Sequence, residues 1–150
     1  MTTLTRSSSS VRGYMTPAPV TVKPRQTLAE VHAVMRARRI HHLPVVDGDK
    51  LVGIVSQRDL MIIESLPGVD AAEVPVEEAM TKDVFVVSPS ASLAAIAGDM
   101  ADRRLGSAVV MDKERVVGVF TVTDACRALA RLLPAPRRRS GVRRRPGRMR

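Results

Sequence analysis

The 150-residue chain has almost no aromatic side chains: it contains no tryptophan, one tyrosine and two phenylalanines. Aliphatic residues and methionine must therefore fill its interior, and a protein-binding surface rich in Trp and Tyr is not expected. The single cysteine, Cys126, excludes an internal disulfide and suits a reducing compartment, so we expect a cytoplasmic protein. No hydrophobic run approaches the roughly 18 residues that span a membrane, and the polar residues 1–10 do not resemble a signal peptide.

Acidic residues are absent from the C-terminal end, and this absence accounts for the net charge of +9. Residues 134–150 hold eight arginines and no acid, which leaves 16 basic and 15 acidic side chains in residues 1–133. Proline and glycine interrupt the arginines, so we predict a disordered basic tail at 134–150. Three interpretations of the tail stay open: a solvated end, an arm attracted to nucleic-acid phosphates, or a docking segment for an acidic protein.

The sequence also lacks the common catalytic and metal-binding patterns. It has no Ser-His-Asp arrangement, no glycine-rich phosphate loop and no pair of carboxylates, so we predict that the protein is not an enzyme. His41 and His42 are adjacent, and adjacent residues on a strand point to opposite faces. No cysteine or acidic cluster accompanies them, so no metal site is expected.

What the chain does contain is a gapless internal repeat. A shift of 65 positions aligns residues 11–60 with residues 76–125, and 15 of the 50 aligned pairs are identical. Such a repeat indicates one supersecondary unit built twice, so a site in one copy should have a counterpart in the other. Because half the chain is small for a stable core, we expect the copies to share one core. The predicted organisation is a flexible leader at 1–10, a first copy at 11–65, a linker at 66–75 and a second copy at 76–133.

Each copy is predicted to follow the order β-α-β-β-α. Thr27 with Glu30 forms a capping box at the start of one helix, and Ser92 is the equivalent cap in the second copy. A polar turn joins the two later strands into a hairpin, and a last helix follows Ser56 or Thr121. The expected strands are 20–22, 43–46 and 51–55, then 84–87, 108–111 and 116–120; the expected helices begin near 28, 57, 93 and 122.

The most specific local pattern is Gly-apolar-apolar-Ser/Thr-x-x-Asp, which occurs once in each copy. A strand that runs into a helix leaves free amides at the positive end of the helix dipole, which suits a phosphate. Ser56 and Thr121 add a hydroxyl there, while Asp59 and Asp124 could each accept two hydrogen bonds from a ribose diol. The same spacing is also a capping box that serves only the helix start. Its recurrence in both copies favours a nucleotide site.

Together, the Met-Thr starts, the Val-x-Pro strand ends, the run Ile40–Asp47 and this motif resemble the CBS domain family, the module named after cystathionine β-synthase. The resemblance covers residues 11–133. It implies an α+β fold in which two repeats pack about a pseudo-two-fold axis and form two clefts. In that family the clefts bind adenosyl ligands: AMP, ADP or ATP, and in some members S-adenosylmethionine or NAD. Such pairs commonly form a homodimer, and the apolar helix surfaces at 60–63 and 125–133 fit that interface.

Carried over residue by residue, the resemblance places ribose on Asp59 and Asp124, and phosphate near Ser56, Thr121 and Arg58. The remaining cleft and adenine residues that it implies are Thr16, Val22, His42, Leu43, Pro44, Val45, Thr81, Val87, Ser107, Ala108 and Val109. The copies differ at several of these positions, because Ser107-Ala-Val replaces His42-Leu-Pro and Thr123 replaces Arg58. We therefore expect either two sites of unequal affinity or a single filled site.

The sequence thus predicts a non-catalytic regulatory module that binds an adenosyl ligand and requires no other cofactor. The alternative is a dimer scaffold built from the same repeats, whose arginine-rich tail binds nucleic acid or an acidic partner. Two arginine pairs, Arg38-Arg39 and Arg103-Arg104, fall at predicted helix ends, where cations suit the helix dipole. We interpret them as solvated helix ends.

Overall fold

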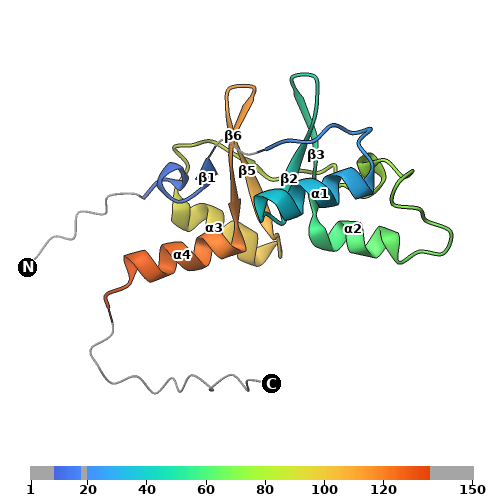
Figure 1. The fold of residues 1–150 in the computed structure, drawn as a ribbon. Helices are drawn as coiled ribbons and strands as arrows, with labels where there is room; N and C mark the ends of the chain where they lie inside the picture. Colours follow the sequence, from blue (N-terminus) through green and yellow to red (C-terminus); the bar gives the residue numbers. More distant parts are fainter. Residues whose placement is uncertain (1–8, 18–19, 136–150) are drawn as a thin grey trace, which may run out of the picture.

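The structure is a computed structural model that describes residues 9–17 and 20–135. Residues 1–8 of the predicted leader and residues 136–150 of the predicted tail lie outside this described part. The fold is α+β (Figure 1). Its elements are the 3-10 turn η1 (Val11–Gly13), β1 (Thr16–Pro17), α1 (Leu28–Arg38), β2 (His42–Asp47), β3 (Lys50–Ser56), α2 (Gln57–Glu64), the 3-10 turn η2 (Val76–Glu78), β4 (Val86–Val87), α3 (Leu93–Asp102), β5 (Ser107–Asp112), β6 (Arg115–Thr121) and α4 (Val122–Leu132).

The two copies form sheets with the same strand order. The second copy lies in a four-stranded sheet of order β1-β6-β5-β4, and the first copy contributes the β2-β3 hairpin. Isolated bridges at both edges of that hairpin, Val22 with Val45 and Ile54 with Thr81, repeat the same order. Both hairpins also carry an irregularity at the same step, between Val45 and Val46 and between Val110 and Met111. The predicted hairpins are confirmed, and their shared irregularity is a further similarity that was not predicted.

The copies exchange their first segments. In β1, Thr16 and Pro17 from the first copy pair with Val119 and Gly118 of β6. Conversely, Thr81 from the second copy exchanges two main-chain hydrogen bonds with Ile54 of β3, at 2.8 and 3.0 Å. Each sheet is therefore completed by an edge that comes from the other copy.

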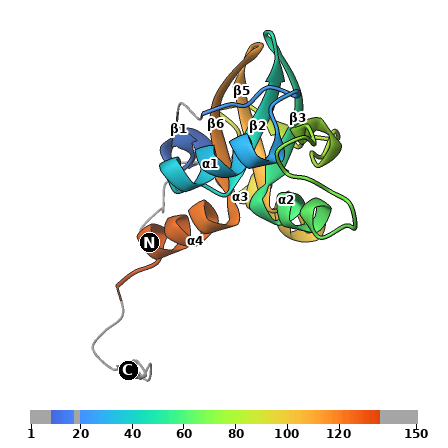
Figure 2. The same cartoon turned by 45° about the vertical axis from the view of Figure 1, so that its right-hand side comes forward.

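Two separate buried clusters form the interior, so the expected single shared core is wrong. One cluster gathers side chains such as Leu28, Leu43 and Leu60 from the first copy, together with Val76 from the second. The other gathers Leu93, Phe120 and their neighbours from the second copy, together with Val11 from the first. Each cluster therefore contains residues from both copies, and in the ribbon β1 of the first copy lies beside β6 of the second (Figure 2).

Two glycines permit this exchange. A Cβ atom added to Gly53 would lie 2.8 Å from Cγ of Met80 and 3.0 Å from the carbonyl oxygen of Thr81. At Gly118, the equivalent atom would lie 3.0 Å from the carbonyl oxygen of Thr16. A strand glycine often marks such a close approach of another backbone. The repeated glycine therefore lets the Met-Thr segment of one copy lie against the sheet of the other.

The predicted first strands are shorter than expected. In the second copy only Val86–Val87 forms a strand, parallel to β5, where the N–H of Val109 donates to the carbonyl of Phe85 at 2.9 Å. The first copy has Pro44 at the position of Val109, and proline has no N–H to donate. Residues 20–22 consequently keep only the bridge at Val22. The unpredicted strand is β1 at Thr16–Pro17, whose partner lies far away in the sequence.

The first helix of each copy ends in an unusual way. Arg39 and Arg104, at equivalent positions, have φ angles of 53° and 55°, in the left-handed region where glycine is usual. The next amides close the turn: Ile40 N–H donates to Met35 at 3.1 Å, and Leu105 N–H donates to Met100 at 2.8 Å. At the helix start, Thr27 accepts from the Glu30 N–H at 3.2 Å, but no returning bond from the Glu30 carboxylate is present among the described contacts. Only half of that predicted capping box forms.

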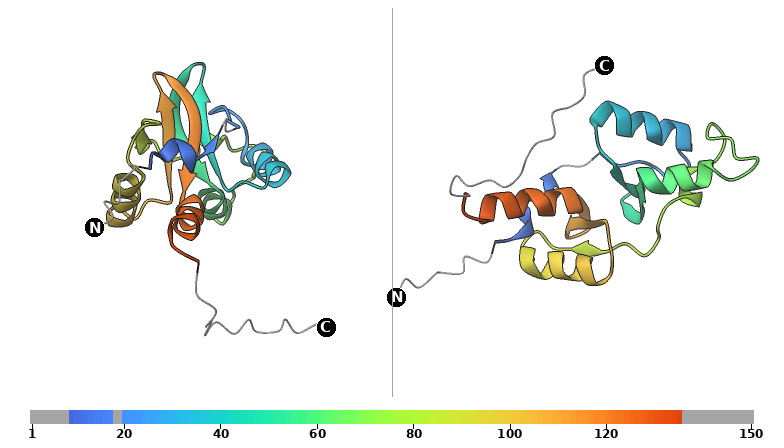
Figure 3. Two further views of the ribbon diagram at one scale, coloured as in Figure 1. Left: turned by 90° about the vertical axis from the view of Figure 1, so that its left-hand side faces the viewer. Right: turned by 90° about the horizontal axis from the view of Figure 1, so that it is seen from below.

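The copies are arranged about an approximate two-fold axis. The two hairpins project on one side, and α2 and α4 lie at the opposite end of the molecule (Figure 1). Seen from that end, α2 takes the place of α4, and α1 takes the place of α3, after a half turn (Figure 3). Among the described residues, no helix has the length and apolar character needed to cross a membrane.

Candidate functional site

Two clefts occupy equivalent places between the copies. The first, here named the Asp59 cleft, is a cavity of about 710 Å³, and the second, the Asp124 cleft, is a cavity of about 510 Å³. Their linings correspond under the 65-residue shift. The matched pairs are Ser56/Thr121, Arg58/Thr123, Asp59/Asp124, Ile62/Arg127, Ile54/Val119, Thr81/Thr16, Phe85/Val20, Arg104/Arg39, Leu105/Ile40, Gly106/His41 and Ser107/His42. The repeat therefore produces two equivalent clefts, and their role as a duplicated site stays a prediction.

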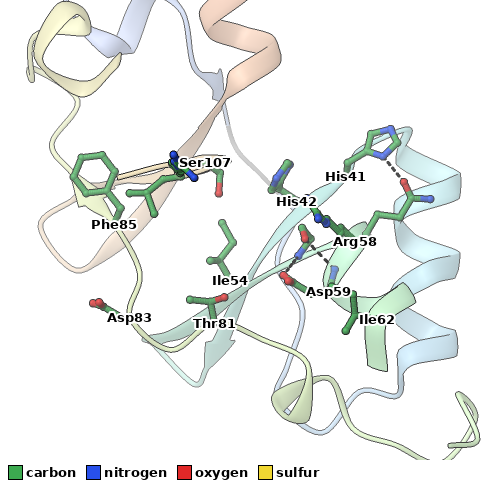
Figure 4. A pocket seen from close by; sticks show the side chains of 15 residues that line it. His41, His42, Ile54, Arg58, Asp59, Ile62, Thr81, Asp83, Phe85 and Ser107 are labelled. Atoms are coloured by element: carbon green, nitrogen blue, oxygen red, sulfur yellow. Dashed lines mark hydrogen bonds between the residues drawn. The ribbon is translucent and has the colours of Figure 1, made fainter. Parts of the chain in front are cut away.

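Each cleft is built from both copies. In the Asp59 cleft, the start of α2 comes from the first copy, whereas Thr81 and the turn at Arg104 come from the second (Figure 4). The Asp124 cleft reverses these roles, with the start of α4 facing Thr16 and the turn at Arg39. The exchange of the Met-Thr segments between sheets is what brings these residues together. Sequence alone indicated the members of the sites but not this crossing.

A strand-to-helix junction forms one wall of each cleft. β3 runs directly into α2, where the Asp59 N–H donates to Ser56 Oγ at 3.1 Å and the Ser56 N–H donates to Asp59 Oδ2 at 2.8 Å. The equivalent bonds in the second copy join Thr121 and Asp124, at 3.2 and 2.9 Å. Both acids thus form the reciprocal capping box. This capping arrangement holds each carboxylate at a helix N-terminus, on the cleft lining.

The two carboxylates differ in what else they contact. Asp59 is half-buried, and its Oδ1 has no hydrogen-bond partner among the described residues. Asp124 is only 4% exposed, and its Oδ1 accepts from Arg127 Nη1 at 3.1 Å and from Thr16 Oγ1 at 3.4 Å. Its Oδ2 accepts a further bond from Thr121 Oγ1 at 3.1 Å. Oδ1 of Asp59 is therefore free to accept a hydrogen bond from a ribose hydroxyl, whereas Oδ1 of Asp124 already accepts from Arg127 and Thr16.

The predicted wall residues divide into two groups. Thr16, Thr81, His42 and Ser107 line the clefts, as does the predicted phosphate residue Arg58. The others do not line either cleft, because their side chains lie in the sheets and against the cores: Val22, Leu43, Pro44, Val45, Val87, Ala108 and Val109. The Pro44 carbonyl already accepts from the Val22 N–H at 3.0 Å. Any contact between this second group and adenine through the main chain stays a prediction.

Several charged lining residues were not predicted as functional. Arg38, Arg39 and Arg104 are exposed at helix ends, as interpreted, and they also line the clefts, Arg38 and Arg39 in the Asp124 cleft and Arg104 in the Asp59 cleft. Arg103 instead lies over the ring of Phe85, 5.0 Å from its centroid. The sequence did hold a signal for these residues, because an arginine pair occurs at the same position in each copy.

Asp83 and Arg127 were also missed, and the repeat gave no signal for them. Asp83 lines the Asp59 cleft, and its counterpart in the sequence is Ala18. Arg127 lines the Asp124 cleft, where the other copy has Ile62. Both residues are charged in only one copy, so the comparison of the copies identified neither.

His42 lies between the two clefts and lines both of them. Burial lowers the pKa of its imidazole below the usual 6.5, and the neighbouring His41 lowers it further, while Asp59 and Asp124 act in the opposite direction. Its Nε2 would lie 3.4 Å from a Cβ at Gly106, so the missing side chain there leaves room for the ring. A neutral imidazole at this place can donate one hydrogen bond and accept another.

The chemistry available in the clefts is that of binding. Helix N-terminal amides and arginines suit a phosphate, a carboxylate suits a ribose, and Ile54, Phe85 and Leu105 give the Asp59 cleft an apolar surface for a flat base. In the described part of the chain, no group of three His, Cys, Asp or Glu side chains gathers as metal ligands would. His41 contacts Gln57 and His32 contacts Glu64, so these two imidazoles have other partners.

Known proteins share this sequence pattern. The family model for the CBS domain matches residues 11–64 and 76–131. The CBS domain-containing protein YhcV of Bacillus subtilis is 29% identical over 116 residues, which are 77% of this chain and 82% of that protein.

Solved structures share the fold. CBSX2, crystallised in complex with AMP, has a TM-score of 0.71 and 25% identity, and the match covers 82% of this chain and 97% of that one. The CBS domain pair of MJ0100, in complex with 5-methylthioadenosine and S-adenosyl-L-methionine, has a TM-score of 0.74 and 26% identity, covering 81% and 96%. With both repeats matched by the family model, the chain belongs to the CBS domain family.

Proposed function

We propose that this protein is a regulatory module that binds adenosyl ligands in its two clefts and catalyses no reaction. The observation that carries the proposal is the composition of the clefts. Each combines a helix N-terminus, a carboxylate held there by a capping box, and apolar residues from the other copy. This set matches the phosphate, ribose and base of a nucleotide.

The bound molecules in the similar structures support the adenosyl part of this proposal. CBSX2 holds AMP, and MJ0100 holds 5-methylthioadenosine and S-adenosyl-L-methionine. These ligands share adenosine and differ in what is attached to its 5′ carbon. We therefore propose an adenosyl ligand of this kind, with AMP, ADP, ATP, S-adenosylmethionine and NAD as the compounds to test. No further cofactor is required in this proposal.

A regulatory role follows from the crossed construction of the clefts. A ligand in the Asp59 cleft contacts the start of α2 in the first copy and Thr81 in the second. Binding therefore favours one relative position of the two copies over others, as any ligand does that contacts one state better. Ile62 of α2 lines this cleft and is also 52% exposed, so it connects the cleft to the outer surface of the helix.

We also propose that this helix surface forms a homodimer interface. Of the surfaces expected at 60–63 and 125–133, Leu60 and Ala128 are buried within the chain. The exposed apolar side chains at this end of the molecule are Met61, Ile62, Val122, Leu129, Leu132 and Leu133. Light scattering should give the mass of a dimer, and Met61→Asp combined with Leu132→Asp should give the monomer mass. A monomer in the unmodified protein would contradict this interface.

Calorimetry on ligand-free protein tests the binding function. At least one of the five compounds should bind, and Asp59→Asn should weaken its binding because the amide presents one oxygen where the carboxylate presents two. Asp112→Asn, at the exposed end of β5, is the matched control and should bind normally. Absence of heat with all five compounds would contradict the function. Equal affinities of Asp59→Asn and the unmodified protein would contradict only the ribose role.

The alternative, an arginine-rich tail that binds nucleic acid or an acidic partner, concerns residues that lie almost entirely outside the described part of the chain. Eight arginines within residues 134–150 support it. It predicts salt-sensitive binding to DNA or RNA that disappears when residues 136–150 are removed. Binding that survives this truncation would contradict it. A cytoplasmic location, supported by the single exposed thiol of Cys126, completes the proposal.

A further inference from the structure

We propose, on the basis of the adenosyl-binding function above, that the two clefts select different adenosyl ligands. The Asp124 cleft takes ligands with a di- or triphosphate on the 5′ carbon. The Asp59 cleft takes ligands whose 5′ group carries little negative charge, such as a nucleoside, a thioether or a sulfonium. The differences between the two linings carry this proposal.

The clefts differ first in charge. The Asp59 cleft is lined by Arg58 and Arg104 and by Asp59 and Asp83, so its fixed charges cancel. The Asp124 cleft is lined by three arginines and a single carboxylate, which leaves a net charge of +2. The arginines there are Arg38, Arg39 and Arg127. A triphosphate is attracted to the second lining and gains no net attraction from the first.

Three local differences make the Asp124 cleft more positive, each by one charge. A fourth acts in the opposite direction, because Arg58 lines the Asp59 cleft where the other copy has Thr123, and it reduces the difference to two charges. Asp83 adds a carboxylate to the Asp59 cleft, on the segment that also carries Thr81 and Phe85 (Figure 4), where the other copy has Ala18 in the sequence. Arg127 adds a guanidinium to the Asp124 cleft where the other copy has Ile62.

The third difference concerns an arginine that both copies share. Arg38 lines its cleft, whereas its counterpart Arg103 lies over the Phe85 ring, 5.0 Å from the centroid, and does not line the other cleft. Phe85 replaces Val20 of the first copy, so the aromatic ring is what the second copy adds. The arginine pair of the first copy therefore supplies two cations to the Asp124 cleft, whereas the equivalent pair of the second copy supplies only one, Arg104, to the Asp59 cleft.

The carboxylates differ in the same sense. Oδ1 of Asp59 has no partner among the described residues, so a ribose hydroxyl can bind it directly. At Asp124, a ribose must first displace Arg127 or Thr16 from Oδ1. The Arg127 side chain is 66% exposed, so it can turn to a phosphate and release that oxygen. Ribose binding in the Asp124 cleft therefore depends on the phosphates, whereas in the Asp59 cleft it does not.

The backbone at Arg39 and Arg104 provides test variants. Both residues adopt φ angles above +50° where their helices end, a conformation that costs little for glycine and more for arginine. Glycine at either position therefore suits the backbone while it removes the arginine side chain from the cleft.

NMR titration of the full ¹⁵N-labelled chain tests the proposal, because it reports on each cleft separately. The amide of Arg58 reports on the Asp59 cleft, and the amide of Thr123 reports on the Asp124 cleft. Adenosine should shift the Arg58 signal and leave the Thr123 signal unchanged at the same concentration. ATP should shift the Thr123 signal. We define the preference of a cleft as its affinity for ATP divided by its affinity for adenosine. At low salt this preference should be at least about tenfold higher in the Asp124 cleft than in the Asp59 cleft.

Matched variants then locate the cause. Arg39→Gly and Arg127→Ile should each weaken ATP binding at Thr123 by about fivefold or more while thermal unfolding confirms an intact fold. Arg104→Gly, the control in the other cleft, should leave the ATP affinity at Thr123 unchanged. The same affinity ratio in both clefts, or ATP binding that ignores Arg39→Gly and Arg127→Ile, would overturn the proposal while leaving the adenosyl function standing. No shift with any adenosyl compound at either amide would overturn the function itself.

Discussion

The two copies share one backbone arrangement and differ in many of their side chains. Strand order, bulge position, helix caps and the exchanged Met-Thr segments recur at equivalent residues. Several of the side chains that fill the cores and line the clefts differ between the copies, such as Val55 and Phe120 in the cores and Arg58 and Thr123 in the clefts. Backbone geometry in this protein is therefore set by a small number of repeated residues, including Gly53 and Gly118, while packing and ligand preference vary around them.

One pair of facing positions shows how the cores diverge. In the first copy Leu43 lies opposite Val55, and in the second Ala108 lies opposite Phe120. All four side chains are buried. The larger residue of the pair lies on the first strand of the hairpin in one copy and on the second strand in the other. The summed side-chain volume of the pair therefore differs less between the copies than the volume at either position. Cores tolerate such exchanges when total volume is kept.

The largest predicted effect comes from separating that pair. Phe120→Val should lower the free energy of unfolding by about 2–4 kcal/mol, because it leaves a cavity beside Ala108. Ala108→Leu alone should also destabilise, by about 1–3 kcal/mol through overpacking. The double variant reproduces the first copy and should recover most of the loss. Denaturant unfolding measures all three, and strictly additive losses would show that the two positions do not compensate.

The next effect tests the exchange between copies. Gly53→Val and Gly118→Val should each lower the free energy of unfolding by about 1–3 kcal/mol, because either side chain would meet the carbonyl oxygen of the facing Met-Thr segment. The exposed Gly98 of α3, which has no heavy atom within 4 Å of an added Cβ, is the control site. Gly98→Ala should be neutral or stabilising. Tolerance of valine at both strand glycines would contradict the close approach.

A smaller effect should distinguish the two capping carboxylates. Asp124→Asn should cost about 1–2 kcal/mol, since Asp124 is buried and accepts from Thr16 and Arg127 as well as from its own helix start. Asp59→Asn should cost less, about 0.5–1 kcal/mol, because only the capping bonds depend on it. Thermal unfolding of both variants without ligand gives the order. The reverse order would mean that the contacts of Asp124 add nothing to the fold.

The smallest effect concerns pH. Because the pKa of His42 is lowered in the folded chain, the unfolded chain takes up the proton more readily. The contribution of His42 is therefore complete above its ordinary pKa of 6.5 and is lost progressively as the pH falls below it. His42→Ser, which introduces the residue of the second copy, should flatten the fall in stability between neutral and mildly acidic pH. His41→Ser removes only the smaller of the two causes that lower the His42 pKa, so it should flatten the pH dependence of stability less. An unchanged pH dependence in both variants would contradict this account.

The sequence predicted the elements well because their signals are local. Ser56 and Asp59, or Thr121 and Asp124, determine where a helix begins through bonds that span three residues, and the predicted starts at 57 and 122 are confirmed. The hairpins followed from alternating apolar residues around a polar turn. The CBS resemblance then supplied the fold class and the pairing of two copies.

What the sequence could not give depends on contacts between distant residues. Thr16 reaches β6 and Thr81 reaches β3, and no pattern within either copy indicates that crossing. The same holds for Arg39 and Arg104, whose cleft positions depend on a left-handed turn at a helix end. The absence of a full strand at 20–22 differs from these cases, because it has a local cause: Pro44 has no N–H to donate, and this could be read from the sequence.

A crystal structure of the protein with adenosine would test the central claim most directly. The account predicts adenosine in the Asp59 cleft, with a ribose hydroxyl within hydrogen-bonding distance of Asp59 Oδ1 and contacts to Thr81 from the other copy. Adenosine bound outside both clefts, or bound in the Asp59 cleft without contact to Asp59, would contradict it.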